Sequence, residues 1–212
     1  MRITKIERQK KRSSRKSVFI DGSFAFGISD DVLLKFALHE GTQLEKGTME
    51  KILEREHEET AKQKAFRFLS IRPRSKKEIR DYLSRKEFTA DITENVIARL
   101  ESLSMLDDVS FARMVCRDAL AKKPVGEKML RQGLFKKGVP RPIIETVVAE
   151  FFTPESELQM AVKAAERQRT RVERSSKRLD NDHFKKKILD YLVRHGFTYD
   201  TALNATKQLL SK

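Results

Sequence analysis

A short helical pattern occurs three times along the chain, and this repetition constrains the fold more than any other feature. It is clearest in residues 75–88 (SKKEIRDYLSRKEF), where the apolar residues Ile79 and Leu83 stand one helical turn apart. A shift of 51 positions takes Ile79, Leu83, Lys86 and Phe88 to Leu130, Leu134, Lys137 and Val139. A further shift of 58 positions takes these to Ile188, Leu192, His195 and Phe197. Apolar residues at i and i+4, followed by an apolar residue after a turn, indicate a buried helical stripe. The sequence therefore predicts a tandem helical array.

The composition favours several small packed units over one large core. Of the 212 residues, only 39% are hydrophobic, 36% are charged and none is Trp. Units with so little apolar surface must bury their hydrophobic face against a neighbour, as repeat proteins do. We expect a mainly α fold, with tandem three-helix repeats in an elongated curved array and a small antiparallel β element at the N-terminus.

The charge balance indicates an anionic partner. Lys and Arg number 45 against 31 Asp and Glu, which gives a formal charge of +14. Nucleic acid, a nucleoprotein or an acidic protein groove would all suit such a surface. No apolar run approaches a membrane span, and the N-terminal MRITKIERQKKR lacks the apolar core of a signal peptide. We expect a cytoplasmic protein without membrane contact.

Residues 1–47 form the expected β element. Asp21-Gly22 separates two apolar runs at 18–20 and 23–26, which is typical of a hairpin with a two-residue turn, and residues 3–6 supply a further strand. Eight basic residues within 1–16 suit either an arm that seeks phosphates or a sheet edge protected by charge. A helix is expected from Ser29 or Asp30 to Leu38, ended by Gly41.

The three repeats are expected at 48–107, 108–153 and 154–212. The first begins with an acidic helical stretch that ends near Ile71, because the residue before Pro73 leaves the helical region, and its third helix spans 91–103. The second repeat has helices at 111–121, 126–137 and 140–151. The third has helices at 155–174, at 184–194 with Asp180 or Asp182 as cap, and at 199–210. Its basic segment 167–180 is either an extended helix or a mobile connection.

Basic residues recur at outward positions of the central helices. With about 100° per residue, Ile79 and Leu83 face the core while Lys77 and Arg80 point outward. The outward sites, which we call the basic ridge, are Lys77, Lys128 and Lys186, then Arg80 and Arg131, then Arg85, Lys136 and Arg194. We interpret the ridge as a surface for a partner or for DNA. The alternative is that duplicated helices kept a solvated, charged face.

No catalytic or metal-binding pattern stands out. The four histidines show no ligand spacing with one another or with Cys116, and Cys116 aligns with Ala65, which indicates a small core residue. Phosphate-cradling and dinucleotide loops are absent from the sequence. Asp107-Asp108 precedes a helix, which favours capping over metal binding. Phe66, Phe68, Phe111, Phe151 and Phe152 stand at the spacing of helical core residues. The sequence therefore does not predict exposed aromatic residues on which bases could stack. We expect a binding protein without a cofactor, not an enzyme.

Three motifs in order resemble the bacterial RecX regulators. They are RPRSKKEIRDYLSRKEF, LDDVSFARMVCRDAL and KPVGEKMLRQGLFKKGVP. The resemblance is good over residues 61–148 and looser over the whole length. The resemblance implies tandem three-helix repeats and a protein that binds the RecA recombinase filament on single-stranded DNA and limits its growth and activity. It also implies that partner contacts involve RecA, with single-stranded DNA met directly or through the filament. We expect a monomer.

Two departures from the RecX pattern carry predictions of their own. Lys86-Glu87-Phe88 replaces the Lys-Gly pair of Lys137-Gly138, which predicts that the first turn avoids the left-handed conformation. The acidic stretch at 50–59 would repel DNA, so its helix is expected to face away from the basic ridge.

Two other functions remain open on the sequence alone. A stand-alone helical repeat protein that binds nucleic acid without sequence preference would bind DNA or RNA tightly and with strong salt dependence. A protein-docking scaffold for an unrelated target would respond little to DNA.

Overall fold

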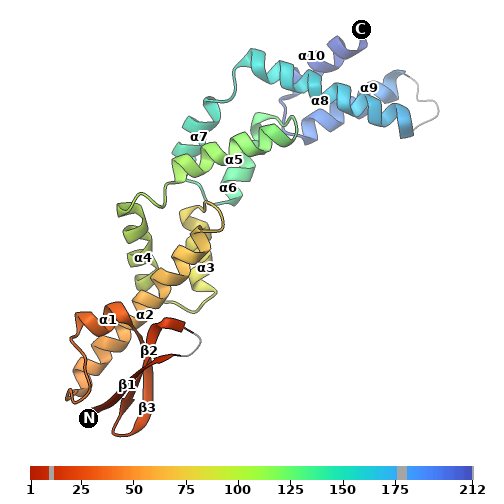
Figure 1. Ribbon diagram of the computed structural model, residues 1–212. Coiled ribbons are helices and arrows are strands. Elements are labelled where there is room, and N and C mark those ends of the chain that lie inside the picture. The colour runs from red at the N-terminus through yellow and green to blue at the C-terminus, as the bar shows by residue number, and fades with distance from the viewer. Residues whose placement is uncertain (10–11, 176–180, 212) are drawn as a thin grey trace. The chain divides into compact units, whose positions relative to one another are not determined.

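The computed structural model of the protein describes residues 1–9, 12–175 and 181–211 (Figure 1). The strands are β1 (Ile3–Gln9), β2 (Arg12–Ile20) and β3 (Ser23–Ser29). The helices are α1 (Asp30–Lys35), α2 (Lys46–Leu69), α3 (Lys76–Ser84), α4 (Ala90–Ser102), α5 (Asp108–Lys122), α6 (Glu127–Lys136), α7 (Arg141–Ala149), α8 (Pro154–Ser175), α9 (Asn181–Arg194) and α10 (Tyr199–Leu210). The predicted class, mainly helical with a small N-terminal sheet, is confirmed.

The chain divides into two compact units. The first contains Met1–Arg72 and Ile79–Ser102, and the second contains Pro73–Glu78 and Leu103–Lys212. The first residues of α3 therefore belong with the second unit, where they contact the second repeat.

The first unit opens with the predicted antiparallel sheet, in the order β1-β2-β3. Asp21 and Gly22 have φ angles of 49° and 85°, so the tight hairpin turn between β2 and β3 uses two left-handed residues. Helix α1 ends at Lys35, and the prediction of a helix reaching Leu38 is wrong. The backbone of Ala37 turns to a φ of 47°, and Leu38 is instead buried in the core beneath the sheet.

Helix α2 packs on the sheet through a buried polar network. Glu56 is 6% exposed, and its carboxylate forms an ion pair of 2.7 Å with Arg15 and accepts hydrogen bonds of 2.7 and 2.8 Å from the backbone N–H and the hydroxyl of Ser29. Such charge-assisted partners are what a buried carboxylate needs. Glu56 and Glu59 of the acidic stretch are thus buried within the first unit.

The first repeat is built from the second half of α2 with α3 and α4. Ala61 and Ala65 are fully buried, as are the stripe residues Ile79 and Leu83 of α3. Phe68 stacks on Tyr82 with 4.1 Å between ring centroids. The i, i+4 spacing read from the sequence thus marks the helical face that packs.

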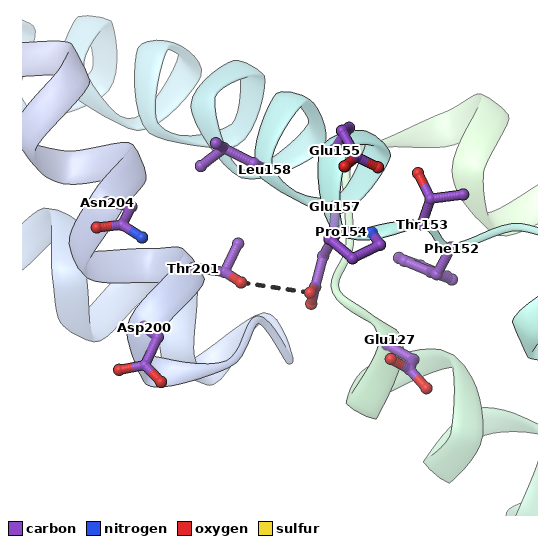
Figure 2. Close-up of a pocket in the computed structure, with 10 residues that line it drawn as sticks. All are labelled: Glu127, Phe152, Thr153, Pro154, Glu155, Glu157, Leu158, Asp200, Thr201 and Asn204. Carbon is purple, nitrogen blue, oxygen red and sulfur yellow. Dashed lines mark hydrogen bonds between the residues drawn. The ribbon is translucent and has the colours of Figure 1, made fainter.

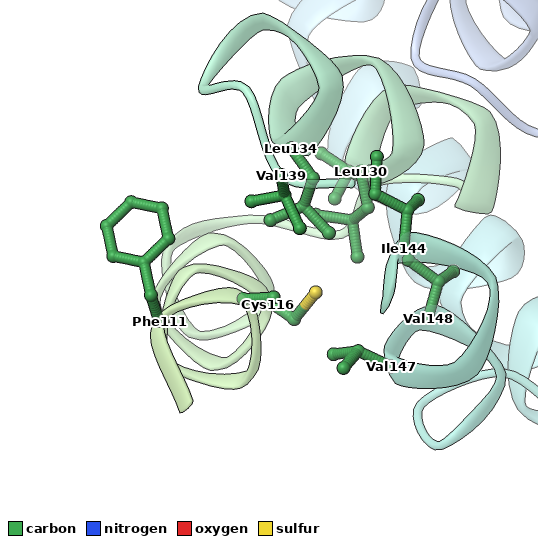
Figure 3. Packing of buried hydrophobic residues seen from close by; sticks show 10 residues of the cluster. Phe111, Cys116, Leu130, Leu134, Val139, Ile144, Val147 and Val148 are labelled. Atoms are coloured by element: carbon green, nitrogen blue, oxygen red, sulfur yellow. The ribbon is translucent and has the colours of Figure 1, made fainter. Parts of the chain in front are cut away.

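The second repeat has its own hydrophobic core, formed where α5, α6 and α7 converge (Figure 3). Leu130, Leu134 and Val139 of the predicted stripe and plug lie in this core. Cys116 is fully buried there, and burial raises the pKa of its thiol to about 11. The prediction of a small core residue is confirmed.

The third repeat consists of α8, α9 and α10 around a core that includes Ala161, Ile188 and Leu192. Helix α8 continues to Ser175, so the first part of the basic segment is an extended helix. Asp182 lies inside α9, not at its cap, and Asp180 lies outside the described residues.

The turn after each central helix has the same geometry. Glu87, Gly138 and Gly196 have φ angles of 64°, 75° and 89°. In each copy the next residue donates its N–H to a carbonyl five places back, from Phe88 to Leu83, from Val139 to Leu134 and from Phe197 to Leu192. This is the Schellman type of helix ending. The prediction that the first turn avoids the left-handed conformation is wrong: Glu87 adopts it, because the turn's hydrogen bonds and the buried plug Phe88 require it.

Candidate partner-binding surface

The second unit contains a joint between the start of one central helix and the turn of the next repeat. Ser75 Oγ donates a hydrogen bond of 2.6 Å to the carbonyl oxygen of Lys137. The same hydroxyl accepts the N–H of Glu78 at 3.1 Å, so it also caps α3. A methyl group on Gly138 would lie 2.2 Å from Cδ of Lys77. Gly138 must therefore lack a side chain so that the start of α3 can pack against the turn.

The same joint is repeated one step along the chain. The N–H of Gly126 donates to the carbonyl of His195 at 2.9 Å, and that of Lys128 donates to Gly196 at 3.1 Å. A methyl group on Gly126 would lie 2.2 Å from the carbonyl carbon of Gly196. Ser75 and Gly126 occupy equivalent repeat positions, as do Lys137 and His195. Gly138 and Gly196 are thus needed for close approach as well as for their positive φ angles, and Gly126 for close approach alone. Glu87, at the equivalent turn of the first repeat, has an exposed side chain.

Buried carboxylates complete both joints. Asp108 is 3% exposed and its Oδ1 accepts the N–H of Lys76 at 3.0 Å. Glu157 holds the corresponding place in the next joint, where burial raises its pKa and the backbone N–H of Glu127 opposes part of that rise. Asp107 is a helix cap, as predicted, and accepts the N–H groups of Val109 and Ser110 at 3.0 and 2.9 Å. The Ser110 hydroxyl, and after it these N–H groups, lower the pKa of Asp107. A negative charge near the first turn also suits the helix dipole.

Two members of the basic ridge are held in equivalent ion pairs. Arg80 Nε lies 2.6 Å from Glu94 Oε1, and its hydrogen bonds lower the pKa of Glu94. Arg131 forms the same pair with Glu145, 51 positions along, and also binds Glu127. These arginines join the second and third helices of their own repeats. The third repeat has Leu189 and Leu203 at these positions.

The other six ridge residues, Lys77, Arg85, Lys128, Lys136, Lys186 and Arg194, are exposed. Arg85 and Arg194 share one conformation, in which Nε donates to the carbonyl of the residue four places back at 3.1 Å. The joints bring four of the six into two neighbourhoods within the second unit. The stem of Lys77 packs against Gly138, two positions after Lys136. The backbone N–H of Lys128 bonds to the carbonyl of Gly196, two positions after Arg194.

An exposed aromatic residue was missed by the sequence reasoning. Phe135 is 71% exposed on α6, next to Lys136. The signal was available, since a residue directly after the buried stripe residue Leu134 is rotated about 100° away from the core. Tyr199 is 61% exposed and lines a shallow pocket with Val193 and Arg194. An aromatic face beside a cation is a combination that can stack on a base and contact its phosphate.

Comparison with known proteins decides the family. The family model for the RecX N-terminal domain matches residues 1–45, and those for the first and second three-helix domains of RecX match 61–100 and 107–148. The regulatory protein RecX of Listeria monocytogenes serotype 4a (strain HCC23) is 30% identical over 212 residues, which is all of this chain and 77% of the relative.

The chain belongs to the RecX family. The regulatory protein RecX of Staphylococcus aureus (strain Newman) is 30% identical over 200 residues, covering 94% of this chain and 71% of that protein. A crystal structure of regulatory protein RecX superimposes with a TM-score of 0.77 at 24% identity, covering 100% of this chain and 99% of the other. The RecX structure from Lactobacillus salivarius gives a TM-score of 0.64 at 24% identity over 74% of this chain and 98% of that one. At that identity the two structures establish the fold.

Within the described part of the chain, no group of three or more His, Cys, Asp or Glu side chains could hold a metal ion. None of its helices combines the length and apolar character that crossing a membrane demands.

Proposed function

We propose that this RecX-family chain is a non-enzymatic regulator of the RecA recombinase, which binds the recombinase filament on single-stranded DNA and limits its growth. The observation that carries the proposal is the clustering of exposed ridge residues at the joints, in a chain of formal charge +14. At the second joint, for example, the backbone N–H of Lys128 bonds to the carbonyl of Gly196, two positions after Arg194. Cations spaced in this way suit a repeating anionic surface such as a filament groove.

Binding along such a groove would block the sites that an incoming recombinase subunit needs. Lys and Arg contacts to phosphates position a protein on nucleic acid without reading sequence, and they release counterions. Arg80 and Arg131 contribute less in this account, because their guanidinium groups are held by Glu94 and Glu145. The exposed lysines are the residues expected to meet the filament.

Charge reversal of one lysine in each repeat tests the proposal. The triple variant Lys77→Glu, Lys128→Glu and Lys186→Glu should lose binding to RecA filaments in a co-sedimentation assay and keep its helical content and melting temperature. A matched control, Lys35→Glu, Lys51→Glu and Lys207→Glu, changes net charge equally at other exposed positions. An equal loss of filament binding in both variants would mean that only net charge matters and not the position of the ridge. Full binding by the ridge variant would show that the ridge does not contact the filament.

A second candidate function is favoured by Phe135. An exposed aromatic ring beside Lys136 suits direct binding of single-stranded nucleic acid without a protein partner. Fluorescence anisotropy with an oligonucleotide and no recombinase separates the two functions. Direct binding predicts tight, strongly salt-dependent association that weakens in Phe135→Ala, whereas regulation through the filament predicts binding that needs RecA.

A further inference from the structure

A pocket of about 450 Å³ in the second unit has a charge opposite to that of the chain (Figure 2). It lies where the first turns of α8 and α10 and the start of α6 meet. Four carboxylates line it: Glu127 from α6, Glu155 and Glu157 from α8, and Asp200 from α10. Among the lining residues that the structure describes, none is basic. In a protein of formal charge +14 this is a local concentration of negative charge.

Glu157 is the central group of the pocket. It is only 8% exposed, and one carboxylate oxygen, Oε2, accepts a hydrogen bond of 3.3 Å from Thr201 Oγ1. The other oxygen, Oε1, is buried and has no hydrogen-bond partner of ordinary geometry. Figure 2 shows the carboxylate pointing into the space between Thr201 and Glu127. A buried carboxylate with an unsatisfied oxygen is costly for the fold and is completed by a donor from outside.

The electrostatics of the pocket point the same way. Burial raises the pKa of Glu157, the hydroxyl of Thr201 opposes this, and the charge of the nearby Glu127 raises it further. The backbone groups of Thr198 and Glu127 lower it by smaller amounts, and the net shift is upward. Glu127 is itself partly neutralised by Arg131, whose Nε lies 2.7 Å from its Oε1. A cation placed among these groups would relieve their mutual repulsion.

The shape and chemistry of the walls select among cations. Phe152, Pro154 and Leu158 add apolar surface to the lining. A planar guanidinium presents five N–H donors in a fork that matches carboxylates, and it stacks on aromatic faces, whereas an ammonium is a compact, strongly hydrated charge. The volume leaves room for the methylene stem of the side chain as well as for the charged group.

We propose that this pocket binds the guanidinium group of an arginine side chain presented by a protein partner. Glu157 Oε1 accepts from the guanidinium deep in the pocket, Asp200 and Glu155 neutralise it at the mouth, and Phe152 packs against its stem. The pocket contains no residue of the basic ridge. The inference goes beyond the proposed function and does not depend on it, because it concerns a cation-binding site in a protein whose ridge suits anions.

The test uses the full-length chain labelled with ¹⁵N and the probe N-acetyl-arginine amide, with N-acetyl-citrulline amide as its uncharged counterpart. Binding is read from the amide signals of Thr201 and Asp200. The arginine probe should shift these signals with saturation, and the citrulline probe should not. Glu157→Gln should weaken binding by at least about tenfold, since it removes a charge-assisted pair.

A variant on the same helix controls for overall charge. Glu173→Gln removes one negative charge from α8 at an exposed position paired with Arg169, about 24 Å along the helix from Glu157. It should bind the probe as the wild type does. If Glu157→Gln loses its folded spectrum, Asp200→Asn at the exposed mouth replaces it, with an expected weakening of about threefold.

Three results would overturn the inference. One is equal binding of the arginine and citrulline probes, and another is arginine binding unchanged in the pocket variant. The third is tighter binding of spermidine than of the arginine probe, which would make the site one for small polyamines and not for a protein side chain.

Discussion

Ser75 and Lys137 stand 62 positions apart in the sequence, yet the Ser75 hydroxyl donates a hydrogen bond of 2.6 Å to the Lys137 carbonyl oxygen. Ser75 is fully buried at this joint. A backbone carbonyl at a helix end is one of those that the helix itself leaves without a partner. One side chain therefore begins α3 and satisfies the end of α6, so that capping and the packing of successive repeats depend on the same atom.

Replacing Ser75 with alanine should remove both interactions. We expect Ser75→Ala to lower the free energy of unfolding by about 1–3 kcal/mol, because a cap is lost and a buried carbonyl is left unsatisfied. Urea unfolding followed by circular dichroism measures the change. Ser84→Ala, at an exposed position of the same helix, is the control and should change stability by less than about 0.5 kcal/mol.

The turn glycines give a second prediction. Gly196→Ala places a methyl group 2.4 Å from the backbone nitrogen of Met129 at a φ of 89°, and should destabilise the second unit by at least about 1–2 kcal/mol. Gly133→Ala in the interior of α6 meets nothing within 4 Å and should stabilise the protein by about 0.5–1 kcal/mol. Thermal unfolding of both variants checks the pair. Similar effects from the two substitutions would mean that Gly196 serves only as a helix stop.

The two equivalent ion pairs predict a modest contribution to stability and only a small contribution to binding. A double-mutant cycle on Arg131 and Glu145 should give a coupling of about 0.2–1 kcal/mol, because Glu145 is 52% exposed and such pairs are screened by solvent. The double variant Arg131→Leu with Glu145→Leu copies the residues at the equivalent positions of the third repeat. It should remain folded and should bind RecA filaments as the wild type does. Loss of filament binding by a folded double variant would instead mean that Arg131 contacts the filament.

The pKa of Glu157 predicts a pH dependence of stability. Because its pKa is raised in the folded state, that state binds the proton more tightly than the unfolded chain does. The contribution of Glu157 is therefore most favourable below its ordinary pKa and is lost as pH rises through the raised value. The stability difference between Glu157→Gln and the wild type should therefore shift in favour of the variant as pH rises above the ordinary pKa of a glutamate, about 4.3. A difference that stays constant with pH would contradict the burial of an ionised carboxylate.

The sequence predicts the helical repeats well because their signal is local. Ile79 and Leu83 repeat with their partners in register, and the apolar stripes they mark are the buried faces. The hairpin at Asp21 is predicted for the same reason, since two residues determine its turn.

The failures concern contacts between segments that are distant in the sequence. The burial of Glu56 depends on Arg15 and Ser29, and neither the acidic stretch nor the basic strand reveals that partnership alone. Glu87 adopts a left-handed φ that its residue type disfavours, because the buried plug after it requires the turn. Spacing gives the equivalence of Arg80 and Arg131 but not the carboxylates that hold them.

The most direct test of the proposed function is ATP hydrolysis by RecA on single-stranded DNA, measured as the wild-type chain is added from sub-stoichiometric to equal amounts. We predict inhibition at low ratios, retained by the control variant with Lys35, Lys51 and Lys207 reversed and lost when Lys77, Lys128 and Lys186 are reversed. Unchanged hydrolysis with the wild-type chain, in the presence of intact direct DNA binding, would contradict the account and leave a stand-alone nucleic-acid-binding protein.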